Sequence, residues 1–314
     1  MKKTMFNETH IEGLLYEHKL DLKVSGENSK NPGTEFIAGT IQIATDDACL
    51  NVVPVHFTYV TATTKSGGPN NTFNALKRII DGAPCVTKDG KDNAIKLRCD
   101  SALGLNEFYS DRDGQPSLVS VKRNEGGFVH IVTDELNADE KQRATFSTDI
   151  LITGTRDVEA NPDRNTPAKL IIKGYAFDFR KALLPVEFSV LNENGMRYFG
   201  NLECSEKRPV FTKVWGRQVS QTVYREIKEE SAFGDASVRR VETPNKDFVV
   251  TGTAKEPYLW DDEDGITAAE LVEALQNREV YLATVKQRQE DYQNSRKAAP
   301  TPIAASAANT GYNF

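Results

Sequence analysis

The sequence predicts a mainly β protein in which two similar halves are followed by one α-helix and a disordered tail. Three observations predict it. Up to about residue 260, short β-branched and aromatic runs alternate with Gly, Pro, Asn and Asp, which is typical of strands and turns. The order of these runs is the same in both halves. Beyond residue 260 the pattern changes to helical spacing and then to small residues.

The internal repeat spans three strand-like segments in the same order, each set followed by a short helical segment. The matched pairs are 11–13 with 152–154, 36–43 with 170–177, 53–60 with 184–191, and the helical 72–80 with 195–202. Chance similarity between amphipathic strands is the alternative. Three strands, a short helix and further strands form the order of an OB-fold, a five-stranded, partly open Greek-key barrel. The sequence therefore predicts a first OB-like β-barrel at residues 1–140 and a second at 141–258.

A hairpin signal lies in the first half. Gly126-Gly127 separates two strand runs, and glycine accepts the positive φ that tight hairpins need. Lys122 and Arg123 precede the glycines and Phe128 follows them. The sequence thus predicts a basic, aromatic hairpin tip that closes over a ligand, with an ordinary solvated turn as the alternative.

Residues 259–295 are predicted to form an acidic linker and an amphipathic helix. Thr267 and Glu270 have the spacing of a capping box, and Ile266 and Leu271 that of a hydrophobic staple. We expect a helix over 268–292, and its narrow apolar stripe either docks on a barrel or pairs with another chain as a homo-oligomer. Residues 296–314 are small and Pro-containing, which predicts a disordered tail.

Bulk composition narrows the class of protein. No apolar run is long enough to cross a membrane, and the N-terminus has no signal-peptide pattern, so we expect a cytoplasmic protein. The four cysteines and four histidines show no metal-binding spacing, which predicts free thiols and neither metal nor cofactor. The net charge is −6, but basic residues outnumber acidic ones within 141–260.

Catalytic motifs are missing from the sequence. It contains no phosphate-binding glycine loop, no nucleophile elbow and no zinc-protease motif. Asp46-Asp47 is a carboxylate pair that an enzyme would use for acid–base or metal chemistry, but adjacent aspartates more often cap a turn. We therefore predict a binding protein that is not an enzyme.

The candidate binding residues combine aromatic rings with cations. In the strand run 210–217, the two-residue period places Phe211, Lys213, Trp215 and Arg217 on one face, and Lys173 and Tyr175 share a face of an earlier strand. Flat rings on which bases stack, alternating with cations that hold phosphates, suit a single nucleic-acid strand. The alternative is that Phe211 and Trp215 pack beneath the nearby helix. With the hairpin, the predicted site comprises Lys173, Tyr175, Phe211, Lys213, Trp215, Arg217, Lys122, Arg123 and Phe128.

The two barrels, the segment 209–216, the acidic linker and the tail ending in Phe314 resemble bacteriophage-type single-stranded-DNA-binding proteins over residues 10–255. That resemblance implies sequence-tolerant binding of single-stranded DNA in phage replication or recombination in the host cytoplasm. It also implies replication proteins as partners, with Tyr312 and Phe314 at the tail tip. The alternative function is a structural or assembly protein of a phage particle.

Overall fold

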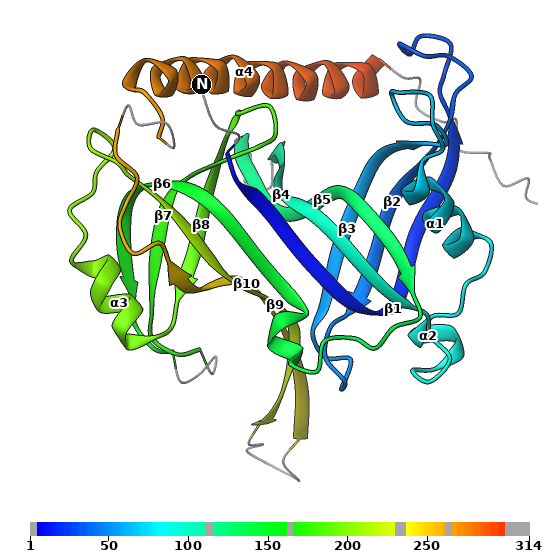
Figure 1. Cartoon of the computed structure of the whole chain (residues 1–314), viewed down its shortest axis with the longest axis horizontal. Coiled ribbons are helices and arrows are strands. Elements are labelled where there is room, and N and C mark those ends of the chain that lie inside the picture. Colours follow the sequence, from blue (N-terminus) through cyan, green and yellow to red (C-terminus); the bar gives the residue numbers. More distant parts are fainter. Residues whose placement is uncertain (1–4, 111–115, 162–165, 230–236, 261–264, 299–314) are drawn as a thin grey trace, which may run out of the picture.

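Two β-barrels lie side by side in the computed structural model, and one long helix crosses the same edge of both (Figure 1). The structure describes residues 5–110, 116–161, 166–229, 237–260 and 265–298, and for 222–229, 237–244, 293 and 295–298 only the backbone is described. Within the described residues, no helix is both long and apolar enough to span a lipid bilayer.

The first barrel is closed by strands in the order β1-β2-β3-β5-β4-β1. All neighbours are antiparallel except β3 and β5, which are parallel. The helices between β3 and β4 pack on the end of this barrel. Its elements are β1 (Asn7–Val24), β2 (Glu35–Ala44), β3 (Val52–Thr61), α1 (Asn71–Ile80), α2 (Val86–Asp89), β4 (Lys96–Ser110) and β5 (Ser117–Val132).

The second barrel repeats the first strand by strand, with one helix in place of two between its third and fourth strands. Its strands close in the order β6-β7-β8-β10-β9-β6, again with the third and fifth strands parallel. This order is that of the OB-fold, so the predicted fold class is confirmed; the boundary at residue 140 stays a prediction. The elements are η1 (Glu140–Gln142), β6 (Ala144–Val158), β7 (Lys169–Phe177), β8 (Leu183–Val190), α3 (Glu193–Gly200), β9 (Val210–Glu229) and β10 (Ser237–Thr253).

A direct strand pairing joins the barrels. β1 and β6 are the first strands of their barrels, and they pair antiparallel from Asn7–Thr148 to Ile11–Ala144. We call this pairing the seam. β1 also pairs with β2 and β4 of the first barrel, so it links that barrel to β6 of the second. The seam runs between the two barrels. The outer surfaces of β4 and β5 lie on one side of it, and that of β9 lies on the other.

The cores follow from alternation along the strands. Each barrel encloses its own apolar cluster, with Ile41 and Phe57 in the first and Ile172 and Phe188 in the second. A third cluster lies on the outer face of the second barrel, where Phe177 and Phe211 pack against Ile266. Large apolar side chains that point out of the second barrel therefore lie on a face that the C-terminal segment covers.

The predicted hairpin at Gly126-Gly127 is wrong. Residues 117–132 form the single strand β5, and the glycines form a bulge at which the register with β4 shifts between Asp100 and Ala102. Gly127 has φ 99°, and a Cβ there would lie 2.0 Å from the carbonyl oxygen of Asp100. The two glycines do mark a special backbone conformation, but they allow two strands to approach closely and do not form a turn. The actual β4–β5 connection, residues 111–115, lies outside the described residues.

The C-terminal helix α4 runs from Ala268 to Ala298 and begins at the predicted residue. The capping box is formed, because the amide of Glu270 donates to Thr267 Oγ1 (3.2 Å) and the amide of Thr267 donates to Glu270 Oε2 (2.9 Å). α4 contacts β4 and β8, so it docks on both barrels; pairing with another chain stays a prediction. The helix includes residues 296–298, and the rest of the predicted tail lies outside the described residues.

Candidate functional site

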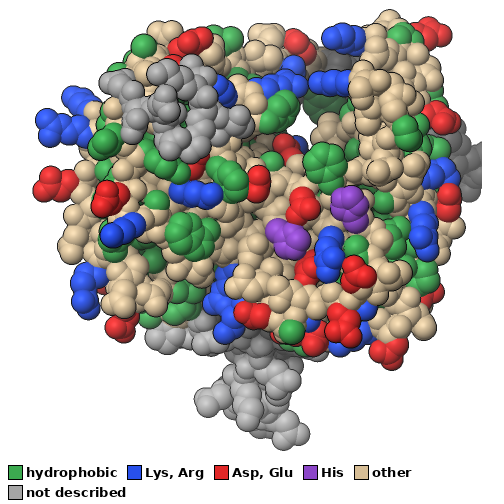
Figure 2. Space-filling model, viewed as in Figure 1, with side chains coloured by type: hydrophobic (Ala, Val, Ile, Leu, Met, Phe, Trp, Pro, Cys, Tyr) green, Lys and Arg blue, Asp and Glu red, His purple; other side chains and the backbone are tan. Residues whose placement is uncertain are grey.

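A groove of about 1250 Å³ follows the seam between the two barrels. Its floor consists of residues 8–10 of β1 and 145–147 of β6. Residues 125–128 of β5 form one side and residues 215–217 of β9 form the other. Figure 2 shows this face as an uneven surface on which apolar, acidic, basic and histidine side chains meet. The groove exists because the seam holds the two barrels at a fixed spacing.

Three exposed aromatic rings line the groove. Phe128 is 69% exposed, Phe179 81% and Trp215 42%, and they come from β5, the β7–β8 turn and β9. Fully burying a large apolar side chain contributes roughly 1.5–3 kcal/mol to folding. Rings left in water by three separate elements, around one hollow, form an apolar surface of the kind that marks binding sites.

The indole of Trp215 is oriented by the strand beside it. On β9, Thr212 and Val214 are buried while Trp215 faces outward. A Cβ at Gly252 of β10 would lie 2.4 Å from the indole Nε1, so the ring rests directly on this glycine. The missing side chain at residue 252 therefore makes room for the ring at the groove wall.

Two cations at the groove have no ion-pair partner among the described residues. Arg217 follows Trp215 on the same face of β9, and its buried Nε has no hydrogen-bond partner within the described part of the chain. Lys141 projects from η1. Phosphate oxygens would satisfy both groups.

The groove also has acidic side chains, most of which are held by neighbours. Asp100 Oδ1 lies 2.7 Å from His10 Nδ1, and Glu125 pairs with Arg123. Asp139 accepts the amide of Lys141 at 3.0 Å. Glu8 remains as a carboxylate without an ion pair among the described residues. Local charge is thus mixed, so a ligand gains more from the rings than from a positive field.

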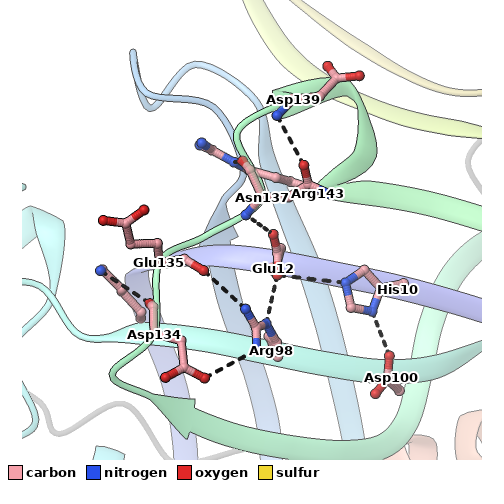
Figure 3. A network of polar contacts seen from close by, with 10 residues as sticks. His10, Glu12, Arg98, Asp100, Asp134, Glu135, Asn137, Asp139 and Arg143 are labelled. Atoms are coloured by element: carbon pink, nitrogen blue, oxygen red, sulfur yellow. Dashed lines mark hydrogen bonds and ion pairs between the residues drawn. The ribbon is translucent and has the colours of Figure 1, made fainter.

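A polar network supports the first-barrel side of the groove (Figure 3). The carboxylate of Glu12 on β1 accepts from Arg98 Nε of β4 at 2.8 Å and from the amide of Asn137. Burial alone would raise the pKa of Glu12, but these hydrogen bonds and the Arg98 charge outweigh burial and lower it. The Arg143 guanidinium also donates to the carbonyl oxygen of Asn137. The network holds the loop between β5 and η1, which leads to Lys141.

The comparison with known protein families assigns the chain to a family. The family model described as YorF matches residues 6–288, which include both barrels and most of α4. The chain belongs to the YorF family. A search of curated proteins finds no match to this YorF chain.

Two solved structures resemble this YorF chain at low similarity. The crystal structure of the wild-type single-stranded DNA binding protein from Thermus aquaticus has a TM-score of 0.45 and 11% identity, covering 82% of this chain and 96% of that one. A deletion variant of the same protein has a TM-score of 0.44 and 11% identity, covering 82% and 97%. A phage type stays a prediction. Similarity this distant assigns no residue of the groove.

The structure brings some predicted residues of the YorF chain into the groove. Trp215, Arg217 and Phe128 line it. Arg123 lies beside it, paired with Glu125. Phe128 reaches the groove from a bulge inside β5, whereas the sequence predicted a hairpin tip.

Phe211 is not in the groove. It is 2% exposed, and its ring centroid lies 4.9 Å from that of Tyr258 and 6.1 Å from that of Phe177. Its strand face is outward as predicted, but Ile266 at the start of the C-terminal segment covers it. Phe211 therefore cannot stack on a base. Lys213, next on this face, has its amine 3.5 Å from the centroid of the Phe6 ring.

Lys122 also lies away from any hairpin tip. Its amine is 5.4 Å and 5.2 Å from the ring centroids of Phe188 and Phe248 in the second barrel and donates to the carbonyl oxygen of Glu187. Burial lowers the pKa of Lys122. Lys122 therefore joins the barrels and does not line the groove.

Lys173 and Tyr175 occupy the outer face of β7. The Lys173 amine pairs with Glu187 Oε1 at 3.2 Å, and Tyr175 packs partly against the outer cluster. Neither residue lines the groove. Two strands of the second barrel, β7 and β9, thus carry aromatic and basic residues on their outer faces without forming one surface.

Sequence reasoning missed Phe179. β7 ends at Phe177 and the chain turns directly after it. Asp178 Oδ1 accepts the amides of Arg180 (2.8 Å) and Ala182 (2.7 Å), and Lys181 has φ 66°. The run Asp-Phe-Arg-Lys after an apolar strand was the available signal, since Asp favours turns. The turn presents Phe179 to solvent with Arg180 over its ring at 5.0 Å.

The acidic pair that an enzyme might use is engaged in local structure. Asp46 Oδ1 accepts the amide of Asn51 at 2.7 Å. Asp47 Oδ1 accepts from the Arg143 guanidinium at 2.7 Å, and this bond lowers the pKa of Asp47. Across the described ranges, no group of His, Cys, Asp or Glu side chains has the arrangement of a metal site.

Proposed function

We propose that this chain binds single-stranded DNA in the groove along the seam, without catalysing a reaction. The observation that carries the proposal is the convergence of Phe128, Phe179 and Trp215 on one groove from three separate elements. In a duplex the base faces are already stacked on each other. A single strand offers them to aromatic side chains, and each stacked base contributes roughly 1–3 kcal/mol.

The charges around the groove support a binding mode dominated by stacking. Arg217 and Lys141 are available for phosphates, whereas most of the carboxylates are held by neighbours. Each phosphate neutralised on a single strand contributes about 0.7 to the slope of log affinity against log salt, so these two cations contribute about 1.4. We therefore expect the affinity to fall only shallowly with rising salt, because two phosphate contacts release few counterions.

Fluorescence anisotropy with labelled oligo-dT tests the proposal. Trp215→Ala should weaken binding by about tenfold, since 1.4 kcal/mol lies within the range of one lost stacking contact. Trp260→Ala is the matched control: Trp260 is 39% exposed but does not line the groove. Absence of binding at low salt would exclude the function. Equal losses in the two variants would remove the groove as the site.

The setting that we propose is replication or recombination of phage DNA in the host cytoplasm, with replication proteins as further partners. The resemblance of the sequence to phage-type single-stranded-DNA-binding proteins supports this setting. Sequence-tolerant stacking suits DNA that is unpaired only briefly. Protection of long single-stranded DNA from nuclease checks it, with duplex DNA of the same length as the control that should remain unprotected.

A further inference from the structure

A second hollow lies beneath α4. It has a volume of about 1020 Å³ and is lined by the first barrel, the second barrel and the helix. It shares Ala102, Glu125, Gly126 and Phe179 with the groove, so the two adjoin, and we call the groove and the hollow together the path. Figure 2 shows an opening between the helix at the top of the view and the barrels below it.

α4 is held to the barrels on both sides of this path. At its start, Ile266 and Leu271 belong to the apolar cluster on the second barrel. Further along, the guanidinium of Arg278 pairs with Glu107 of β4 in the first barrel and donates to the carbonyl oxygen of Leu183 in the second at 3.1 Å. Both charged side chains are largely buried. The helix is therefore a strap that crosses the path and is fastened to both barrels.

The hollow repeats the chemistry of the groove. Tyr281 of α4 and Tyr59 of β3 present exposed rings to it, and Phe179 belongs to both spaces. Arg180 and Lys181 supply cations at the β7–β8 turn. Five carboxylates line it. Glu107 is bonded to Arg278, Asp178 to turn amides, Glu125 to Arg123 and Glu270 to the amide of Thr267, whereas Glu273 has no ion pair among the described residues. Rings and cations thus continue along the path beyond Phe179.

We propose that bound single-stranded DNA continues from the groove through the hollow beneath α4, so that the chain encloses the strand. This inference rests on the proposed function, because it extends the same binding path. Phe179 is the residue at which the strand passes from one space to the other.

Site-specific photocrosslinking tests the path. Tyr281→p-benzoylphenylalanine places a photoreactive ring in the hollow, and Val280→p-benzoylphenylalanine is the matched control, since Val280 is exposed on the same helix turn but does not line the hollow. With bound oligo-dT, we expect several-fold more crosslinked DNA from residue 281. Equal or absent crosslinking from 281, in a protein that still binds the oligonucleotide, would overturn the inference. Loss of binding by the unsubstituted chain would instead remove the proposed function.

Closed circular DNA tests enclosure. A circle has no end to thread, so it enters only if α4 lifts, and we expect slower association than for a linear strand of the same length and sequence. Arg278→Ala unfastens the strap and should bring the two rates together. Arg288→Ala is the control, because Arg288 is exposed on the same helix and makes no ion pair among the described residues. Identical rates for circle and linear strand in the unsubstituted chain would show that the strand is not enclosed.

Discussion

At the residue scale, binding strength depends on how firmly each exposed ring is oriented. Trp215 rests on the backbone at Gly252, whereas Phe128 and Phe179 are largely surrounded by solvent. An oriented ring loses less conformational freedom when a base stacks on it. Trp215 should therefore contribute more to affinity than a more exposed ring of similar area.

Gly252→Ala tests the orientation of Trp215. The added Cβ would lie 2.4 Å from the indole Nε1, so the ring must move. We expect weaker oligo-dT binding together with a shift in the tryptophan emission maximum, measured in a Trp260→Phe background. Unchanged emission and unchanged affinity would show that the ring does not depend on this glycine.

The free energy of unfolding depends on pH through Glu12. Its folded-state pKa lies below the ordinary value of 4.5, so the folded chain binds fewer protons there than the unfolded chain. Its contribution is complete above pH 4.5 and is lost as the pH falls through the folded pKa. Urea unfolding of Glu12→Gln should therefore show a stability deficit at pH 7 that shrinks below pH 4.5. A deficit that is constant with pH would contradict this account.

At the scale of elements, the bulge in β5 positions Phe128. Gly126 and Gly127 both have positive φ, but only at Gly127 would a side chain meet the backbone of β4. Substitutions at these two adjacent glycines therefore separate the effect of a positive φ from that of the close approach of β4.

Gly127→Ala should lower the free energy of unfolding by at least about 1–3 kcal/mol, the usual cost of a strained non-glycine conformation. Gly126→Asn should have a smaller effect, because Asn tolerates this conformation and nothing lies within 4 Å of a Cβ there. Urea unfolding midpoints measure both. Equal losses would mean that positive φ, and not contact with Asp100, decides the requirement.

The Arg278–Glu107 pair fastens α4, and its removal should loosen the helix. Arg278→Ala leaves Glu107 buried without an ion-pair partner, and breaking such a pair costs about 3–5 kcal/mol when it is fully desolvated. We expect faster hydrogen exchange in α4 while the amides of β1 and β6 stay protected. Adding Glu107→Gln should recover part of the protection, which a purely steric role of Arg278 would not produce.

At the scale of the whole molecule, local patterns predicted the barrels but not the surface between them. Alternation and the repeated strand order are encoded in short segments, so the OB-fold could be read from them. Alternation also placed Phe211 and Trp215 on one strand face. It does not reveal that Ile266 covers Phe211 and leaves Trp215 exposed. The groove itself depends on the β1–β6 pairing, which joins residues far apart in the chain.

The pairing of β1 with β6 means that each half covers a strand edge of the other. Excising residues 141–258 would strip β1 from residues 144–148 of β6 and expose a row of backbone amides and carbonyls. Unpaired edges of this kind recruit other chains. The separate halves should therefore tend to aggregate, whereas the intact chain should melt in a single cooperative transition.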